Sequence, residues 1–200
     1  PFALDLCREL GLADQLIRRN KASEARKLVE TALAKKPGHP VATIVKSRLL
    51  SRAGDDEAAK TALEDALKVH PEDPRLLMAL SRAHLDAKDY PAAAKILEHG
   101  RKVCPLDGDW LEQLARLYKM TGETDKLLGV LQELVIQDPD ELDGRVKLAR
   151  VSLEAGKPAE AERFANDALR IDVNNEDARK ALIEALKAQS KTADVEKLLK

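Results

Sequence analysis

Residues 40–71 read PVATIVKSRLLSRAGDDEAAKTALEDALKVHP, and residues 74–105 read PRLLMALSRAHLDAKDYPAAAKILEHGRKVCP. Both stretches begin and end with proline, and between the prolines they consist mainly of good helix formers. Each is divided near its middle by a short polar segment, at Gly54 and at Lys88, which indicates the end of one helix and the start of another. The second stretch therefore repeats the pattern of the first, and each predicts a pair of helices.

The same pattern extends in both directions along the chain. Prolines recur every 34 residues, at Pro37, Pro71, Pro105 and Pro139. With these prolines at position 32 of each unit, the units start near Leu6, Pro40, Pro74, Gly108, Leu142 and Glu176, and the last is cut short at Lys200. The period predicts that residues 1–200 form a single array of repeats.

Small and large apolar residues occupy fixed positions in these units. Positions 8, 20 and 27 are mostly small, as in Ala13, Ser81, Ala93 and Ala168, whereas positions 7 and 24 are mostly leucine. Small residues let two helix backbones approach closely, and the leucines fill the spaces beside them. Because one unit cannot bury its apolar face alone, we expect neighbouring units to share a continuous core.

The turn inside each unit is marked at position 15. The residues there are Asn20, Gly54, Lys88, Gly122, Gly156 and Ser190. A residue in the left-handed conformation at this point would end the first helix of the unit, here called helix A. Asp55, Asp56 and Asp89 then stand where a side chain can cap the free N–H groups of the second helix, helix B.

Composition agrees with an all-helical fold. The chain is 44 % hydrophobic and only 2 % aromatic, so its core must be built from Leu, Ala, Val and Ile. The net charge of −1 argues against a protein dedicated to nucleic acid or to a membrane surface, because such proteins usually carry net positive charge. The chain opens at Pro1 without an initiator methionine. We therefore expect it to be a piece of a longer protein that carries any targeting signal elsewhere, which leaves the compartment open and compatible with the cytoplasm.

The repeat pattern resembles the tetratricopeptide repeat (TPR) family, which has small residues at positions 8, 20 and 27, large apolar ones at 7 and 24, and proline at 32. It departs from the family at position 4, which has no aromatic residue, and at position 11, where only Tyr118 is a tyrosine; Val173 replaces the fifth proline. The resemblance covers nearly the whole chain. It implies an all-α solenoid, a right-handed superhelix of antiparallel helix pairs with the A helices on the concave wall.

Signatures of catalysis are missing from the sequence. No zinc-protease, nucleophile-elbow or phosphate-loop motif occurs, and no two of the four histidines are spaced as a ligand pair on a helix. Cys7 and Cys104 form no CxxC pair and have no histidine beside them at ligand spacing. We predict a chain that is not an enzyme and that binds no cofactor or metal.

The resemblance places ligand-facing residues at positions 2, 5, 6, 9, 12 and 13 of helix A. The family's carboxylate clamp needs lysine at position 5 and asparagine at position 9, and no unit here has asparagine at position 9. Arginine instead occupies position 9 in four successive units, and its planar fork suits carboxylates. The predicted concave-groove residues are Arg48, Arg52, Arg75, Arg82, Ile44, Val45, Met78, Arg116, Lys119 and Arg150, with Val41 and Lys147 beside them.

Two interpretations of the arginines at position 9 stay open. Asp109, Asp143 and Asp177 stand at position 2 of the units that follow Arg82, Arg116 and Arg150, so each arginine can form a salt bridge to the next unit. Exposed pairs of this kind contribute only about 0–1 kcal/mol but would neutralise the surface. The unit after Arg48 has Arg75 at position 2, and Arg48, Arg52, Arg75 and Arg82 are therefore expected to remain an un-neutralised basic cluster.

The favoured function is a protein-interaction scaffold that holds a peptide or partner protein in the concave groove, such as an extended acidic and apolar segment. The alternative is a non-catalytic docking or regulatory arm of a larger enzyme whose catalytic domain lies outside this chain. Nucleic-acid binding is disfavoured by the charge and by the lack of stacking aromatics on the basic inner wall. Weak self-association is expected at the exposed end of the array, through Phe2, Leu4 and Leu6.

Overall fold

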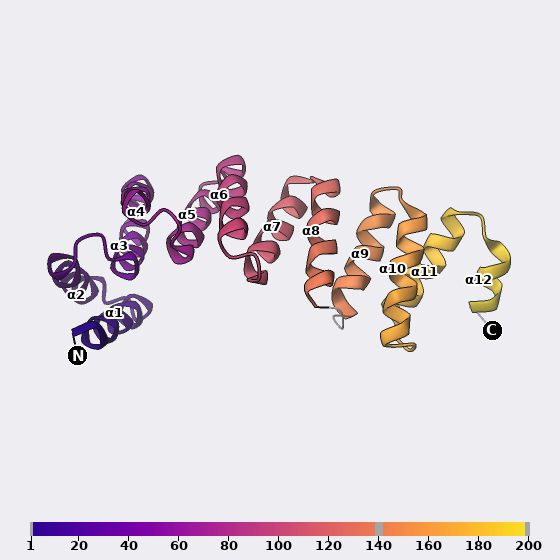
Figure 1. Cartoon of the computed structure of the whole chain (residues 1–200), viewed down its shortest axis with the longest axis horizontal. Coiled ribbons are helices and arrows are strands. Elements are labelled where there is room, and N and C mark those ends of the chain that lie inside the picture. Colours follow the sequence, from indigo (N-terminus) through magenta and orange to yellow (C-terminus); the bar gives the residue numbers. More distant parts are fainter. Residues whose placement is uncertain (1, 139–141, 199–200) are drawn as a thin grey trace. The chain divides into compact units, whose positions relative to one another are not determined.

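The computed structural model describes residues 2–138 and 142–198, with the side chains of residues 10–138 and 142–198. These residues form twelve α-helices and no strand (Figure 1). The helices are α1 (Phe2–Arg18), α2 (Ala22–Lys35), α3 (Pro40–Arg52), α4 (Asp56–Val69), α5 (Pro74–Asp86), α6 (Tyr90–Val103), α7 (Gly108–Thr121), α8 (Thr124–Gln137), α9 (Leu142–Glu154), α10 (Pro158–Ile171), α11 (Glu176–Ala188) and α12 (Thr192–Leu198). The predicted all-α class is confirmed.

The repeat boundaries coincide with helix starts. Helices α3, α5, α7, α9 and α11 begin at Pro40, Pro74, Gly108, Leu142 and Glu176, the residues at which the sequence period starts a unit. Proline suits these starts because the N–H that it lacks would have no partner in the first turn of a helix. Pro139, the fourth proline of the period, lies outside the described residues.

The chain divides into two compact units, Pro1–Pro105 with helices α1 to α6 and Leu106–Lys200 with helices α7 to α12. In each unit, short turns join helices A and B into antiparallel pairs, α1 with α2, α3 with α4 and so on (Figure 1). Each B helix within a unit also packs against the A helix that follows it. Stacking of helix pairs, as the repeat period predicts, is therefore observed inside both units.

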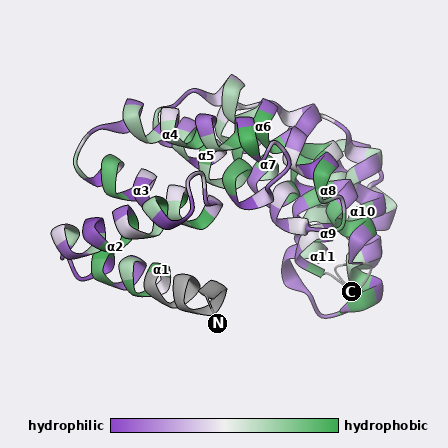
Figure 2. Ribbon diagram, turned by 60° about the vertical axis from the view of Figure 1, so that its left-hand side comes forward, coloured by the Kyte–Doolittle hydropathy of each residue, from purple (hydrophilic) through white to green (hydrophobic). Residues whose placement is uncertain are grey.

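Leucine and alanine form the core of the first unit. One buried cluster joins α1, α2 and α3, with Leu10, Val29 and Val45 at its centre. A second joins α4 and α5 through Leu63, Leu76 and Leu80. Hydrophobic and hydrophilic residues alternate around these helices in Figure 2, as expected where one side of each helix packs and the other meets water.

The second unit also has an aliphatic core, with three aromatic exceptions, Trp110, Tyr118 and Phe164. Trp110 is 1 % exposed and Phe164 is 7 % exposed, and Leu114 and Leu148 are fully buried. A cluster of Val146, Ala168 and Ala178 joins α9, α10 and α11. The indole N–H of Trp110 has no hydrogen-bond partner among the described groups. Trp110 stands at position 3, one residue before the usual aromatic position of the family.

The small residues at positions 8, 20 and 27 lie at helix contacts, as predicted. Position 20 provides the clearest case: Ala25, Ala59, Ala93 and Ala161 are all 0 % exposed. At the fourth unit this position is Leu127, which is buried as well at 7 % exposure. Alanine at these points leaves no room for a larger side chain between the paired helices, because protein cores are packed as densely as organic crystals.

Every turn inside a repeat uses the same backbone conformation. The six residues at position 15 have positive φ: Asn20, Gly54, Lys88, Gly122, Gly156 and Ser190. Lys88, for example, has φ of 59° and Gly54 has φ of 84°. The prediction that this position ends helix A in a left-handed conformation is confirmed, including in the three units that lack glycine.

Side-chain caps start six of the twelve described helices, α3, α4, α5, α6, α7 and α11. Asp55 and Asp89 accept hydrogen bonds from the backbone N–H groups of Ala58 and Ala92, as predicted for the B helices. Asp56 instead lies inside the first turn of α4. At position 34 a second column of caps precedes the A helices, formed by His39, Asp73, Asp107 and Asn175.

Two further expectations concern self-association at the N-terminal end of the array and the absence of a membrane-spanning helix. The side chains of Phe2, Leu4 and Leu6, where self-association is expected, lie outside the described residues, so that expectation stays a prediction. Within the described ranges, no helix has the length and apolar character needed to cross a bilayer.

Candidate partner-binding surface

The A helices of the first unit lie side by side. Helix α3 contacts both α1 and α5, whereas the B helices α2, α4 and α6 have no contact with one another in the described part of the unit. Helices α9 and α11 of the second unit are neighbours in the same way. We call the surface formed by the A helices of each unit its A-helix face. It is the surface on which the sequence places the candidate binding residues.

Three of the four arginines in the predicted basic cluster are held within the first unit. Arg48 of α3 forms an ion pair with Asp14 of α1, with 2.5 Å between Arg48 Nη1 and Asp14 Oδ1. Arg52 Nη1 donates a hydrogen bond to the backbone carbonyl of Ile17. The expectation that this cluster remains un-neutralised is therefore wrong, because helix α1 supplies acceptors for Arg48 and Arg52. That expectation rested on the residue at position 2 of the following unit, whereas α1 belongs to the preceding unit.

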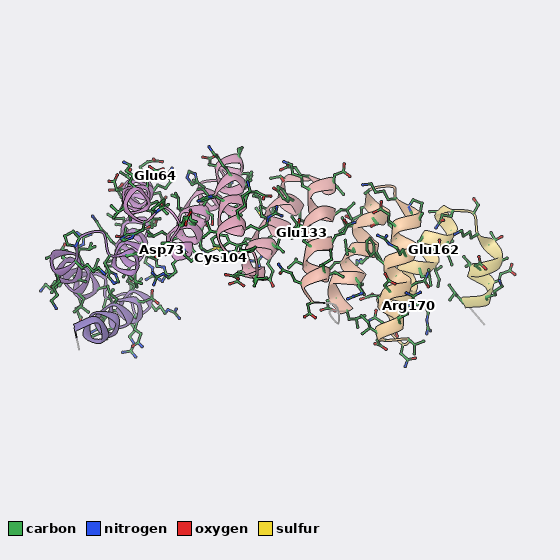
Figure 3. The ribbon with its side chains drawn as sticks, viewed as in Figure 1. Glu64, Asp73, Cys104, Glu133, Glu162 and Arg170 are labelled. Carbon is green, nitrogen blue, oxygen red and sulfur yellow. The ribbon has the colours of Figure 1, made fainter. Side chains whose placement is uncertain are left out.

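The third arginine is held by the cap of its own helix. Asp73, labelled in Figure 3, accepts hydrogen bonds from Arg75 Nη2 at 2.7 Å and Nε at 3.2 Å, and from the backbone N–H groups that start α5. The hydrogen bonds from the Arg75 guanidinium lower the pKa of Asp73, although partial burial opposes this shift. Arg75 thus completes a helix cap and is a poor candidate for direct ligand binding.

The remaining predicted cations are exposed. Arg82 on α5, Arg116 and Lys119 on α7, and Arg150 on α9 have no ion pair with a described residue of their own compact unit. Among the residues that the structure describes, the salt bridges predicted from Arg116 to Asp143 and from Arg150 to Asp177 are not formed.

Asp177 lies near Lys180 of its own helix instead, with 3.8 Å between the carboxylate and the ammonium group. A partner one turn away on the same helix needs no fixed geometry between repeats, so it competes well with a partner on the next A helix. The pair of Arg82 and Asp109 spans the two compact units and stays a prediction.

The predicted apolar strip beside the arginines is mostly core. Val45 is 3 % exposed and belongs to the buried cluster of α1, α2 and α3, so its assignment to the groove is wrong. Ile44 and Val41 are half-buried and pack against the two core clusters of the first unit. Met78 is half-buried on α5, where the hydroxyl of Ser81 donates to its backbone carbonyl. Ile44 and Met78, which both stand at position 5 of their repeats, are therefore partly in the core and partly at the surface.

His39 is a structural histidine that the sequence did not reveal as a cap. Its Nδ1 accepts a hydrogen bond from the backbone N–H of Ala42 at 3.3 Å, which requires the neutral ring. Partial burial lowers the pKa of His39, and the positive charges of Lys36, Arg75 and His70 lower it further, against a raising effect of Asp73. The detectable signal was its position in the repeat, because the equivalent residues of later units include Asp73 and Asn175.

A second surface feature lies on helix α10. Arg163, Asn166, Asp167, Leu169 and Arg170 line an open depression. Arg170, labelled in Figure 3, pairs with Asp167 on the same helix. Among the described residues, no group of three or more His, Cys, Asp or Glu side chains could hold a metal ion. The A-helix faces therefore remain the strongest candidate surfaces for binding a partner.

Comparison with known proteins identifies the repeats. Models of the tetratricopeptide repeat match residues 16–83, 52–117 and 143–166. The first two matches together cover half of the chain. No curated protein is significantly similar to the chain in sequence.

Solved structures share the fold at low sequence identity. MamA from Desulfovibrio magneticus RS-1 (residues 41 to the end) is 18 % identical with a TM-score of 0.62, over 86 % of this chain and 97 % of that one. TTC0263, a TPR protein of Thermus thermophilus, is 23 % identical with a TM-score of 0.56, over 91 % and 99 %. YrrB, described as a TPR protein with an unusual peptide-binding site, is 18 % identical with a TM-score of 0.60, over 86 % and 89 %.

These similarities agree with the helix pairs, the 34-residue period and the position-15 turns described above. TPR proteins generally mediate protein–protein interactions, and the repeats are typically non-catalytic scaffolds. The chain belongs to the tetratricopeptide repeat family.

Proposed function

We propose that the chain is a protein-interaction module that binds an extended acidic segment of a partner protein on its A-helix faces. The observation that carries the proposal is the exposure of the arginines at position 9, Arg82 in the first compact unit and Arg116 and Arg150 in the second, which have no ion pair with described residues of their own units. An arginine side chain offers two parallel N–H donors, which match the two oxygens of a carboxylate.

Neighbouring cations and apolar atoms support the same ligand. Lys119 and Lys147 are exposed at positions 12 and 6 of α7 and α9 and have no ion pair in the described part of their unit. Met120, at position 13 of α7, is 61 % exposed beside Lys119. A segment with acidic residues and an occasional apolar one would satisfy both kinds of group. The neighbour YrrB, which has a peptide-binding site, provides a precedent within the fold.

The test uses a fluorescein-labelled 15-residue peptide of alternating glutamate and alanine, with the corresponding glutamine peptide as the neutral probe. Binding is measured by fluorescence anisotropy at low and at physiological salt, because exposed charges are screened over about 8 Å at physiological ionic strength. We expect the glutamate peptide to bind and the glutamine peptide not to bind.

Two matched triple variants locate the surface. Arg82→Gln, Arg116→Gln and Arg150→Gln together should weaken binding at least about tenfold, or about 1.4 kcal/mol. Lys27→Gln, Lys95→Gln and Arg163→Gln remove the same charge from exposed positions on B helices and should change the affinity less than about twofold. Equal losses in both triples would show non-specific attraction, and no binding to the native chain would remove the acidic segment as the ligand class.

A further inference from the structure

Two arginines of helix α3 already donate hydrogen bonds to acceptors of the kind that an acidic peptide would present. Arg48 Nη1 donates to the Asp14 carboxylate at 2.5 Å, and Arg52 Nη1 donates to the Ile17 backbone carbonyl. Asp14 and Ile17 lie one turn apart on α1, which packs beside α3 on the A-helix face of the first unit. One helix of the chain thus offers α3 a carboxylate and a main-chain oxygen together.

Asp14 is one of two acidic residues in its column of the repeats. Position 9 is arginine in the second to fifth units, at Arg48, Arg82, Arg116 and Arg150, aspartate in the first unit and Glu184 in the sixth. The Asp14 carboxylate also lies 3.2 Å from Arg18 Nη2 on its own helix, and its side chain is only 25 % exposed. Arg18 therefore holds the Asp14 side chain in place while this side chain pairs with Arg48.

The next arginine of the column, Arg82, lies on the neighbouring A helix and has no acidic partner among the described residues of the first unit. Arg82 is on α5, which packs beside α3, and it is exposed without an ion pair to any described residue of the first unit. Without the Asp14 carboxylate, Arg48 and Arg82 would be free guanidinium groups at the same repeat position of two neighbouring A helices. Two such groups can bind two carboxylates of one extended segment.

We propose that Asp14 is an intramolecular blocking residue that occupies Arg48 in place of a ligand carboxylate and so restricts acidic-segment binding in the first unit to Arg82. The inference rests on the proposed function, which it deepens by naming a residue that sets how many arginines are open. A carboxylate attached to the same fold acts at an effective concentration in the millimolar range or above, so a ligand at micromolar concentration does not displace it.

The test replaces Asp14 by asparagine, which keeps the size of the side chain and removes its charge. Affinity for the fluorescein-labelled glutamate and alanine peptide should rise about three- to tenfold, the gain from one further arginine–carboxylate contact. Asp56→Asn makes the same charge change at an exposed position on the B helix α4 and should leave the affinity within about twofold.

Arg48→Gln separates blocking from a general charge effect. In the native chain it should change the affinity less than about twofold, because Arg48 is already occupied, whereas in the Asp14→Asn chain it should cancel the gain. A parallel readout uses the Nε–H resonances of the arginines in NMR spectra. The peptide should shift the Arg48 resonance only in the Asp14→Asn chain, and circular dichroism checks that each variant is folded.

The outcomes distinguish this inference from the proposed function. If the peptide binds the native chain through Arg82, Arg116 and Arg150 but Asp14→Asn behaves like Asp56→Asn, the blocking role is wrong and the proposed function stands. If neither the native chain nor the Asp14→Asn chain binds the peptide, both are wrong. A gain in Asp14→Asn that persists after Arg48→Gln would also overturn the blocking role.

Discussion

At the scale of single residues, the protein shows how a repeat position imposes a conformation regardless of the residue present. Lys88, Asn20 and Ser190 adopt the left-handed backbone that glycine adopts at the same position of the other units. A side chain with a Cβ is strained in this region, by about 1 kcal/mol or more. The turn persists because the helices on both sides of it are fixed by packing.

Lys88→Gly should therefore stabilise the chain by about 1 kcal/mol, because glycine adopts a φ of 59° without steric cost. The reciprocal change Gly54→Lys, at a residue with φ of 84°, should destabilise by a similar amount. Urea unfolding followed by circular dichroism measures both. If Lys88→Gly were neutral or destabilising, strain at position 15 would not be the relevant difference between the units.

His39 predicts a pH dependence of stability. Its pKa is lowered from 6.5 in the folded chain, so the unfolded chain takes up the proton first as the pH falls below that value. The free energy of unfolding should decrease from there until the pH reaches the lowered folded-state pKa, and the cap to Ala42 should be lost with it.

His39→Asn keeps a capping oxygen and does not titrate, so the decrease in stability between about pH 7.5 and about pH 5.5 should be smaller in this variant. The matched control is His99→Asn, the same substitution at an exposed histidine inside α6. Urea midpoints at several pH values give the comparison. A profile of His39→Asn that follows the native one would show that the cap does not couple to protonation.

At the scale of helices, contacts between turns and neighbouring repeats fix the last helix. Glu162 of α10, labelled in Figure 3, accepts hydrogen bonds from Gln189 and from Lys191 in the turn that joins α11 to α12, each at 2.7 Å. These hydrogen bonds, with that from Lys191 the stronger influence, lower the pKa of Glu162 from 4.5. Gln189 also donates to the carbonyl of Pro158, so α10 holds this turn at two points.

Glu162→Gln should loosen α12 without unfolding the rest of the second unit. The variant loses the ion pair with Lys191, and amide exchange of Thr192–Leu198 should become several-fold faster while exchange in α9 and α10 stays the same. Glu160→Gln is the control on the same helix, since Glu160 has no ion pair with a residue that the structure describes. Equal exchange of α12 in both variants would contradict the anchoring role of Glu162.

At the scale of the whole molecule, the contacts are short in range along the sequence. Each helix packs against its neighbours in the chain or against the A helix of the adjacent repeat within its compact unit. The energy of such an array is approximately a sum over repeats and their nearest-neighbour interfaces. Destabilisation introduced at one repeat should accordingly act locally.

Leu63→Ala and Leu148→Ala test this in the two compact units. Leu63 is 1 % exposed on α4 and Leu148 is 0 % exposed on α9, and each truncation should cost about 2–5 kcal/mol. Hydrogen exchange with mass spectrometry should show faster exchange mainly in the unit that carries the change, and the double variant should show the sum. Uniformly faster exchange across both units from either change would show one cooperative array.

The sequence by itself determined the class and the repeat of this protein. The 34-residue period sets the helix starts, the small residues at position 20 mark the helix contacts, and position 15 marks the turns, because each of these is a local requirement that a single residue type satisfies. The exposed cations Arg82, Arg116 and Arg150 were also predictable, because their position in the period places them on A helices.

Only the tertiary structure decided which of the predicted groups are available to a partner. The repeat pattern does not indicate that Asp14 of α1 forms an ion pair with Arg48 of α3. Nor does it indicate that the Ile17 carbonyl accepts a hydrogen bond from Arg52, or that Val45 is buried in the core. These outcomes depend on how closely α1 packs beside α3 and on the rotation of each helix about its axis. Both are fixed by the sum of many weak packing contacts and not by any one residue of the repeat.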